Sequence, residues 1–219
     1  WSFEDGAGYP VQALTAWYGL VELGRARRGS VVLVQSAAGG VGLNALHALQ
    51  QLGARPVAVV GRPEKRDWLA REMGLDPRAI VLRDGRYAAG LDAALVHLGA
   101  PGFDVVFDAV YGPAFRPAFE RLAPEGRLLL YGAADFMGGG GRPNPLRLAW
   151  QWLRRPRLDP LAMISQNRGL LAFNLIWLWG EAARLPEAMR ATLALIPERP
   201  HIGGAWDFAD AHAALAALQ

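Results

Sequence analysis

An apolar run that leads directly into a glycine-rich turn constrains the fold of this chain more than any other feature. Residues 31–34 are all apolar and predict a buried strand, and residues 43–52 predict a helix. Between them, Gly39 and Gly42 lack the Cβ atom that would keep a phosphate away from the backbone. The N–H groups and positive dipole end of the helix would face that phosphate. The pattern therefore predicts a cradle for a dinucleotide pyrophosphate.

The cradle departs from the usual G-x-G-x-x-G pattern, because Ala37 stands at the first glycine position. A second strand predicted at 56–60 supplies the context that such a cradle needs. The alternative is a tight turn without a ligand, but three glycines in four positions cost stability that a plain connection does not require. The predicted cofactor contacts in this turn are Ala38, Gly39, Gly40, Val41 and Gly42.

Composition narrows the classes of function. The 219 residues are 52% hydrophobic, and the absence of cysteine excludes disulfides and thiolate metal sites within this segment. We therefore expect a cytoplasmic protein. The net charge of +3 does not indicate nucleic-acid binding, and Lys65 is the single lysine among 23 basic residues. The chain starts at Trp1 without a secretion signal, which suggests a cut from a longer protein.

Two segments raise the question of membrane contact. The apolar stretch 170–179 is shorter than the roughly 20 residues of a spanning helix, so we expect a buried strand and its exit there. The basic, tryptophan-containing stretch 147–157 fits either an interfacial amphipathic helix or an ordinary surface helix, and we favour the second. We expect no transmembrane segment.

Strand-like runs alternate with helical stretches along most of the chain. A helix is predicted at 8–23, further helices start near Pro63 and Pro113, and the second of these ends near Pro124. Strands are predicted at 31–35, 57–60, 79–82, 104–110, 127–131 and 170–175. This alternation predicts an α/β fold, a doubly wound parallel six-stranded Rossmann sheet with helices on both faces. The ligand would lie along 36–42, 61–65, 109–112 and 132–135, and the glycine run 138–141 would form a lid or a surface loop.

Four blocks resemble the zinc-independent branch of the medium-chain dehydrogenase/reductase superfamily, which includes quinone oxidoreductases and zeta-crystallin-like proteins. The blocks are 13–18, 37–42, 104–110 and 163–175, and the last is most similar to the vesicle amine transport protein group. The resemblance implies that residues 1–24 link to a GroES-like catalytic domain outside this sequence. Residues 25–198 would be the NADPH-binding domain, and 199–219 would begin the return to the catalytic domain.

The end of the second strand favours NADP. Gly61 and Arg62 stand where an NAD site normally places a carboxylate for the ribose 2′-hydroxyl. Lys65 matches a lysine that resembles the phosphate-binding residue of quinone oxidoreductases, with Arg66 beside it. Arg83 lies where relatives often carry a tyrosine next to the adenosine phosphate. The alternative is a solvated helix start.

The resemblance also implies a nicotinamide site, for which the candidates are Thr15, Gly132, Ala133, Phe173 and Asn174. Thr15 would otherwise be an ordinary helix residue and Phe173 a core residue. Catalytic zinc is not expected, because the cysteine ligand of zinc-dependent relatives has no counterpart here. His47, His97, His201 and His212 lack the spacing of metal ligands and are interpreted as structural.

We therefore expect the NADPH-binding domain of a zinc-free oxidoreductase that transfers hydride to a quinone or an α,β-unsaturated carbonyl. One alternative is an enoyl-thioester reductase, which Ala133 and Asn174 disfavour because such enzymes typically carry lysine and aspartate there. The other is a non-catalytic NADPH-binding or membrane-associated protein. The catalytic residues are unknown, and this segment alone should be inactive. A homodimer is expected through the open edge of the last strand, 170–175.

Overall fold

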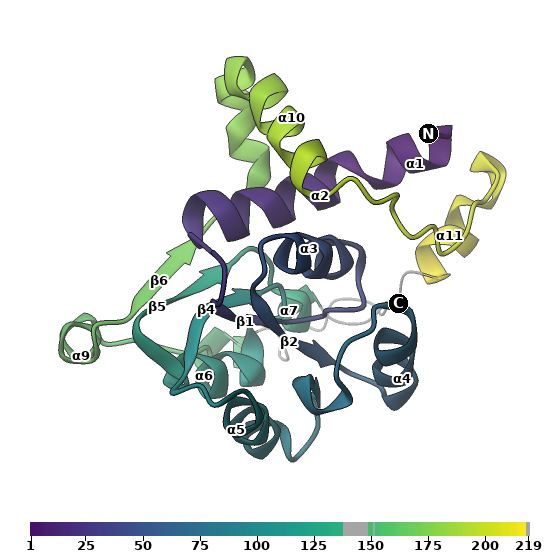
Figure 1. The fold of residues 1–219 in the computed structure, drawn as a ribbon. Helices are drawn as coiled ribbons and strands as arrows, with labels where there is room; N and C mark the ends of the chain where they lie inside the picture. Colours follow the sequence, from purple (N-terminus) through teal and green to yellow (C-terminus); the bar gives the residue numbers. More distant parts are fainter. Residues whose placement is uncertain (138–148, 151, 218–219) are drawn as a thin grey trace.

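The computed structural model describes residues 1–137, 149–150 and 152–217 and contains one six-stranded parallel sheet (Figure 1). The spatial order of the strands is β3-β2-β1-β4-β5-β6. This order reverses between β1 and β4, as expected for a doubly wound fold. The strands are β1 (Val31–Val34), β2 (Arg55–Val60), β3 (Ile80–Leu82), β4 (Phe103–Asp108), β5 (Leu122–Leu130) and β6 (Gly169–Ala172).

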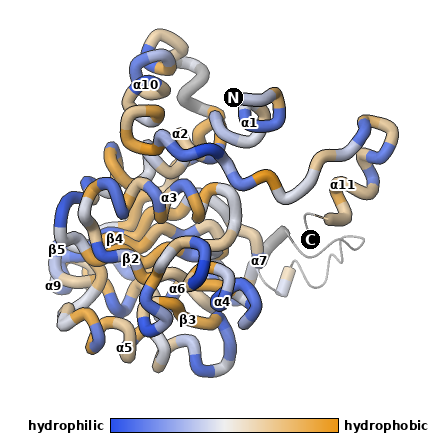
Figure 2. Tube along the Cα trace, turned by 45° about the vertical axis from the view of Figure 1, so that its right-hand side comes forward, coloured by the Kyte–Doolittle hydropathy of each residue, from blue (hydrophilic) through white to orange (hydrophobic). Residues whose placement is uncertain are grey.

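Helices cover both faces of the sheet. One apolar core joins the sheet to α2 (Pro10–Trp17) and α3 (Gly40–Gln51), and the other joins it to α5 (Tyr87–Leu98) and α6 (Gly112–Glu120). All four residues of β1 are buried, as expected for a central parallel strand. Figure 2 shows the hydrophobic strands enclosed by more hydrophilic helix surfaces. The predicted α/β Rossmann-like sheet is therefore confirmed.

The predicted helix 8–23 is divided in the structure. A short α1 (Phe3–Gly8) precedes α2, whose first residue, Pro10, has no N–H group to donate to a preceding turn. A π-helix (Tyr18–Leu23) follows, closed by the Gly24 N–H that donates to the Gly19 carbonyl at 2.7 Å. The sequence indicated helical periodicity but not these changes of hydrogen-bond register.

The β4 and β5 predictions need correction. β4 ends at Asp108 because its carboxylate turns the chain, and β5 begins at Leu122, five residues before the predicted start at 127. The Phe103 N–H donates to the Arg121 carbonyl at 2.8 Å, and the register then shifts between Phe103 and Val105. Pro124 and Gly126 belong to β5 but lie in the stretch between the paired residues Leu122 and Arg127, and they resemble a turn when read locally. Consequently α6 ends at Glu120, before the predicted Pro124.

The predicted buried strand at 170–175 is instead an exposed edge. β6 ends at Ala172, its one strand partner among the described residues is β5, and Leu170 and Leu171 are 36% and 40% exposed. Residues Leu175–Arg184 then form a 3-10 helix that leads into α10 (Leu185–Leu195).

The remaining short elements complete the fold. α4 (Pro63–Glu72) follows β2 and the 3-10 turn Pro77–Ala79 precedes β3, so the strand predicted from 79 begins one residue later. α7 (Ala134–Met137) follows β5, and α9 (Pro160–Gln166) precedes β6. The 3-10 turn Phe208–Asp210 leads into α11 (Ala211–Ala217), which lies apart from the sheet in Figure 1.

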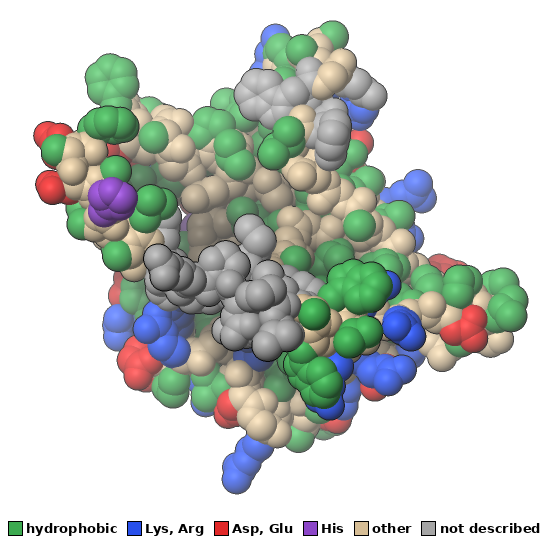
Figure 3. All heavy atoms as spheres, turned by 180° about the vertical axis from the view of Figure 1, so that it is seen from behind, with side chains coloured by type: hydrophobic (Ala, Val, Ile, Leu, Met, Phe, Trp, Pro, Cys, Tyr) green, Lys and Arg blue, Asp and Glu red, His purple; other side chains and the backbone are tan. Residues whose placement is uncertain are grey.

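Several large hydrophobic side chains stand on the surface. Phe3 and Phe208 are more than nine-tenths exposed, and Figure 3 shows hydrophobic groups interspersed with basic ones over the rear face. Within the described residues, no helix is both long enough and apolar enough to cross a bilayer. The glycine run 138–141 lies outside the described residues.

Candidate functional site

The glycine turn between β1 and α3 forms an open cradle at the carboxyl edge of the sheet. Gly39 is the N-cap of α3 and no side chain caps this helix end. A Cβ on Gly42 would lie 2.7 Å from the Ala37 Cα, so glycine is needed where the helix meets the turn. A Cβ on Gly40 would collide with the Gln12 side chain. The first N–H groups of α3 are therefore free of side-chain caps and lie behind backbone that a phosphate can approach closely.

Backbone hydrogen bonds to β2 and within the turn itself hold the glycine turn in place. The Ala37 N–H donates to the Val59 carbonyl of β2 at 2.9 Å, and the Gly39 N–H donates to the Ser36 carbonyl at 2.9 Å. Ser36 adopts a positive φ of 51°, which makes the sharp exit from β1. Ala37 is fully buried and occupies the position of the missing first glycine without obstructing the cradle.

Basic side chains lie at the carboxyl ends of β2 and β3, next to the cradle strand β1. Arg83 follows β3, and its Nη2 atom lies 3.7 Å from the Cβ position on Gly61, which follows β2. The Arg83 Nη1 atom is buried and has no hydrogen-bond partner among the described residues. Gly61, Arg62 and Lys65 are exposed, with Arg62 as the uncapped N-cap residue of α4. The structure thus brings Arg83 and Gly61 together, whereas the sequence only suggested that each was near the same ligand.

A buried polar cluster at the point where strand order reverses was missed by the sequence-based prediction. Gln35 and Asp108 are both fully buried at the ends of the adjacent strands β1 and β4. The Gln35 Nε2 donates to the Tyr87 hydroxyl at 2.6 Å. The Gln35 Oε1 and the Asp108 Oδ2 have no partner among the described residues. In the sequence, the feature that could have indicated this cluster is a polar residue at the end of each of two apolar strands.

Asp108 holds the turn that leads into α6. Its Oδ1 accepts hydrogen bonds from the N–H groups of Val110 at 2.7 Å and Tyr111 at 3.0 Å. Burial raises the pKa of Asp108, and these hydrogen bonds and the charge of Arg83 oppose that rise only in part. Tyr111 has a φ of 61°, a conformation that a bulky residue adopts only when its surroundings impose it. The carboxyl therefore positions backbone at the same edge as the cradle.

Of the residues predicted for the nicotinamide end, Thr15 lies in α2 and the other four follow β5 or β6, and several have local contacts. The Thr15 hydroxyl donates to the Val11 carbonyl of its own helix at 2.6 Å, and the Asn174 Oδ1 accepts from the Ile176 N–H at 3.1 Å. Phe173 packs against Tyr18 with ring centroids 5.4 Å apart. Ala133 is half-buried, and a Cβ on Gly132 would lie 2.8 Å from the Ala109 carbonyl oxygen. Their roles in binding stay predictions.

The histidines have identifiable neighbours. The His97 Nε2 lies 3.0 Å from the Asp76 Oδ2, and the Arg78 hydrogen bonds, more than this histidine, lower the pKa of Asp76. The His201 ring packs edge-on against Trp68. Among the residues that the structure describes, no three His, Asp or Glu side chains gather into a potential metal site.

Known proteins share this architecture. Residues 40–168 match the family model described as zinc-binding dehydrogenase. A highly reducing polyketide synthase of Aspergillus terreus is 41% identical over 135 residues, 61% of this chain and 5% of that protein. The zebrafish (Danio rerio) synaptic vesicle membrane protein VAT-1 homolog is 29% identical over 194 residues, 89% of this chain and 39% of that protein. The chain therefore spans well under two thirds of these relatives.

Two solved structures have a similar fold. The quinone oxidoreductase from Thermus thermophilus, solved also as its complex with NADPH, has a TM-score of 0.74 and 29% identity, covering 99% of this chain and 62% of that one. A putative enoyl reductase domain of a polyketide synthase has a TM-score of 0.66 and 28% identity, covering 85% of this chain and 91% of that one. With the family match extending over more than half of its residues, the chain belongs to the zinc-binding dehydrogenase family, within the medium-chain dehydrogenase/reductase superfamily.

Proposed function

We propose that this chain binds NADPH along the carboxyl edge of its sheet and forms the cofactor-binding half of a reductase. The observation that supports this proposal is the cradle at Gly39–Gly42, where a helix N-terminus without a side-chain cap meets backbone that lacks Cβ atoms at three positions. This arrangement suits a pyrophosphate. The NADPH complex known for the similar Thermus quinone oxidoreductase supports the same choice of ligand.

The preference for NADPH over NADH rests on the neighbouring strand ends. The guanidinium of Arg83 lies against Gly61, and its Nη1 is buried without a partner in the described part of the chain. A 2′-phosphate there would receive charge-assisted hydrogen bonds, and Lys65 on the first turn of α4 would add a second cation. Glu64 lies on the same turn but is exposed, so its charge is screened by solvent.

The proposed reaction reduces a quinone or an α,β-unsaturated carbonyl. A bound reduced nicotinamide would supply the hydride, and the protein would supply position and exclusion of water. The turn that Asp108 holds and the residues after β5 and β6 would form the floor beneath the nicotinamide. We place zinc outside the proposed mechanism, because its cysteine ligand has no counterpart in this sequence.

Two alternatives have specific support. The similarity to a polyketide synthase enoyl reductase domain favours an enoyl thioester as the acceptor. The similarity to the synaptic vesicle membrane protein VAT-1 homolog favours a non-catalytic NADPH-binding or membrane-associated protein. Steady-state NADPH oxidation by the full-length protein with quinones and with enoyl thioesters would separate these, since a binding protein without catalysis would oxidise NADPH with neither.

The cradle itself is tested by Gly40→Ala. The atoms nearest to the new Cβ belong to the side chain of Gln12, so the fold should persist while approach to the helix N-terminus narrows. NADPH affinity, measured by the fluorescence of the reduced nicotinamide, should fall about tenfold. Gly6→Ala is the matched control, because a Cβ there meets nothing within 4 Å. Equal affinities for the two variants would place the pyrophosphate elsewhere.

We further propose a homodimer through β6. Within the described residues no strand pairs with its outer side, and Leu170, Leu171 and Ala172 are exposed. Pairing of two such edges about a two-fold axis would satisfy both sets of backbone groups and cover the leucines. The cytoplasmic location suggested by the cysteine-free sequence stays a prediction.

A further inference from the structure

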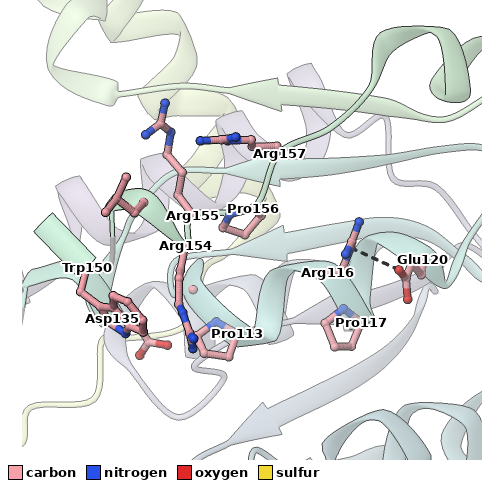
Figure 4. A pocket seen from close by; sticks show the side chains of 12 residues that line it. Pro113, Arg116, Pro117, Glu120, Asp135, Trp150, Arg154, Arg155, Pro156 and Arg157 are labelled. Atoms are coloured by element: carbon pink, nitrogen blue, oxygen red, sulfur yellow. Dashed lines mark ion pairs between the residues drawn. The ribbon is translucent and has the colours of Figure 1, made fainter. Parts of the chain in front are cut away.

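A pocket lies between α6 and residues 150 and 152–157, and none of its lining residues belongs to the glycine turn 36–42. Its volume is about 830 Å³, and its walls include Pro113, Pro117 and Leu153 (Figure 4). The Tyr111 hydroxyl donates to the Pro156 carbonyl at 3.3 Å, which ties this segment to the turn before α6. The pocket is thus built mainly by two segments that are held together at one end, with Asp135 of α7 as a further lining residue.

Arginine side chains dominate the polar part of this pocket, and two of them are held by tryptophans. The Arg154 guanidinium lies 4.0 Å from the ring centroid of Trp150, and that of Arg155 lies 3.9 Å from Trp152. Arg155 also donates from Nη1 to the Trp152 carbonyl at 3.0 Å. Figure 4 shows Arg154 extending towards Pro113. Stacking leaves the edge of a guanidinium, which carries the N–H donors, available to a ligand.

The charges in the pocket do not balance. Four arginines line it, Arg116, Arg154, Arg155 and Arg157, against the two carboxylates Glu120 and Asp135. Glu120 pairs with Arg116 at 3.4 Å, as the dashed line in Figure 4 marks. No ion pair within the described part of the chain engages the three arginines of the 150–157 segment. The described lining therefore carries an excess of two positive charges.

We propose that this pocket binds a small organic anion, a phosphate or carboxylate group carried on an apolar body. Guanidinium forks match both head groups through paired hydrogen bonds. The apolar body would lie against the prolines and Leu153, the last of which is 59% exposed. A volume of about 830 Å³ is within the range of small-molecule sites. This inference does not depend on the proposed NADPH function.

The test uses the 219-residue chain and three probes with the same hexyl chain: hexyl phosphate, heptanoate and neutral hexanol. Titration calorimetry should give saturable binding of at least one anion, with hexanol at least tenfold weaker. Arg154→Ala and Arg157→Ala should each raise the dissociation constant of the anion about tenfold. Arg154→Lys keeps the charge but loses the planar fork, so binding should fall between wild type and Arg154→Ala. The matched control is Arg71→Ala, since Arg71 is 68% exposed and pairs with Glu72 outside the pocket.

Four results would overturn the proposal. One is equal binding of hexanol and the anions, which would leave only an apolar site. Another is an equal loss of affinity in Arg71→Ala and Arg157→Ala, which would indicate unspecific charge attraction. The third is displacement of the anion by NADPH in competition, because the pocket would then be part of the cofactor site. Inorganic phosphate alone should bind more weakly than hexyl phosphate, and equal binding would remove the role of the apolar walls.

Discussion

Replacement of Arg83 by alanine tests the proposed cofactor preference most directly. The Nη2 atom of Arg83 lies 3.7 Å from the Cβ position on Gly61, so this edge of the guanidinium can donate to an anion bound beside Gly61. A hydrogen bond to a charged group contributes about 1.5–3 kcal/mol. Loss of one such contact should raise the dissociation constant of NADPH by about 10- to 150-fold. NADH lacks the 2′-phosphate, so its affinity should change less than about threefold.

The assay is a fluorescence titration of each variant with both reduced cofactors. Lys65→Ala should also lower the affinity for NADPH more than the affinity for NADH. The loss should be smaller than in Arg83→Ala, because Lys65 is exposed. Gly61→Asp should reverse the preference, since a carboxylate there can accept from a ribose 2′-hydroxyl and repels a 2′-phosphate. Arg78→Ala is the control, because Arg78 pairs with Asp76.

The reasoning would be refuted if Arg83→Ala weakened both cofactors equally while the variant remained folded. That outcome would mean that Arg83 supports the adenosine site as a whole rather than the 2′-phosphate. Equal affinity of the unmodified chain for NADPH and NADH would refute the preference itself. Circular dichroism and thermal unfolding of each variant would distinguish these outcomes from loss of the fold.

Three further predictions concern the buried acid, the sheet edge and the extent of the chain. Burial raises the pKa of Asp108, so the folded state holds the carboxyl proton more tightly than the unfolded state does. The free energy of unfolding should therefore fall as pH rises above about 4. Asp108→Asn should flatten this pH dependence in thermal unfolding, and an unchanged pH dependence in the variant would contradict the prediction. Leu171→Arg should shift a dimer to monomer in light scattering, and a monomeric wild type would disprove the β6 interface. The isolated chain should bind NADPH without quinone-dependent oxidation; sustained turnover would place the catalytic machinery within these residues.

The sequence by itself determined the strands, turns and helix starts that are specified by residues close together in the chain. The apolar run 31–34, the glycines at 39, 40 and 42 and the helix after them predicted the cradle, because a strand, a tight turn and a helix N-terminus are each specified by neighbouring residues. Continuous apolar strands alternating with helices likewise predicted a parallel sheet covered on both faces, since right-handed crossovers leave few other arrangements.

Tertiary structure alone decided which distant residues are in contact, where β5 begins and which apolar side chains are exposed to solvent. Arg83 reaches Gly61, and Gln35 bonds Tyr87 across 52 positions, because parallel packing aligns strand ends that the chain separates by a helix. β5 starts at Leu122 because β4 offers pairing partners, which outweighs a local pattern typical of a turn. β6 is exposed although its residues are apolar, and it is the edge strand of the sheet that the described residues form. Local periodicity reports which residues prefer burial, whereas the order of strands determines which of them are buried.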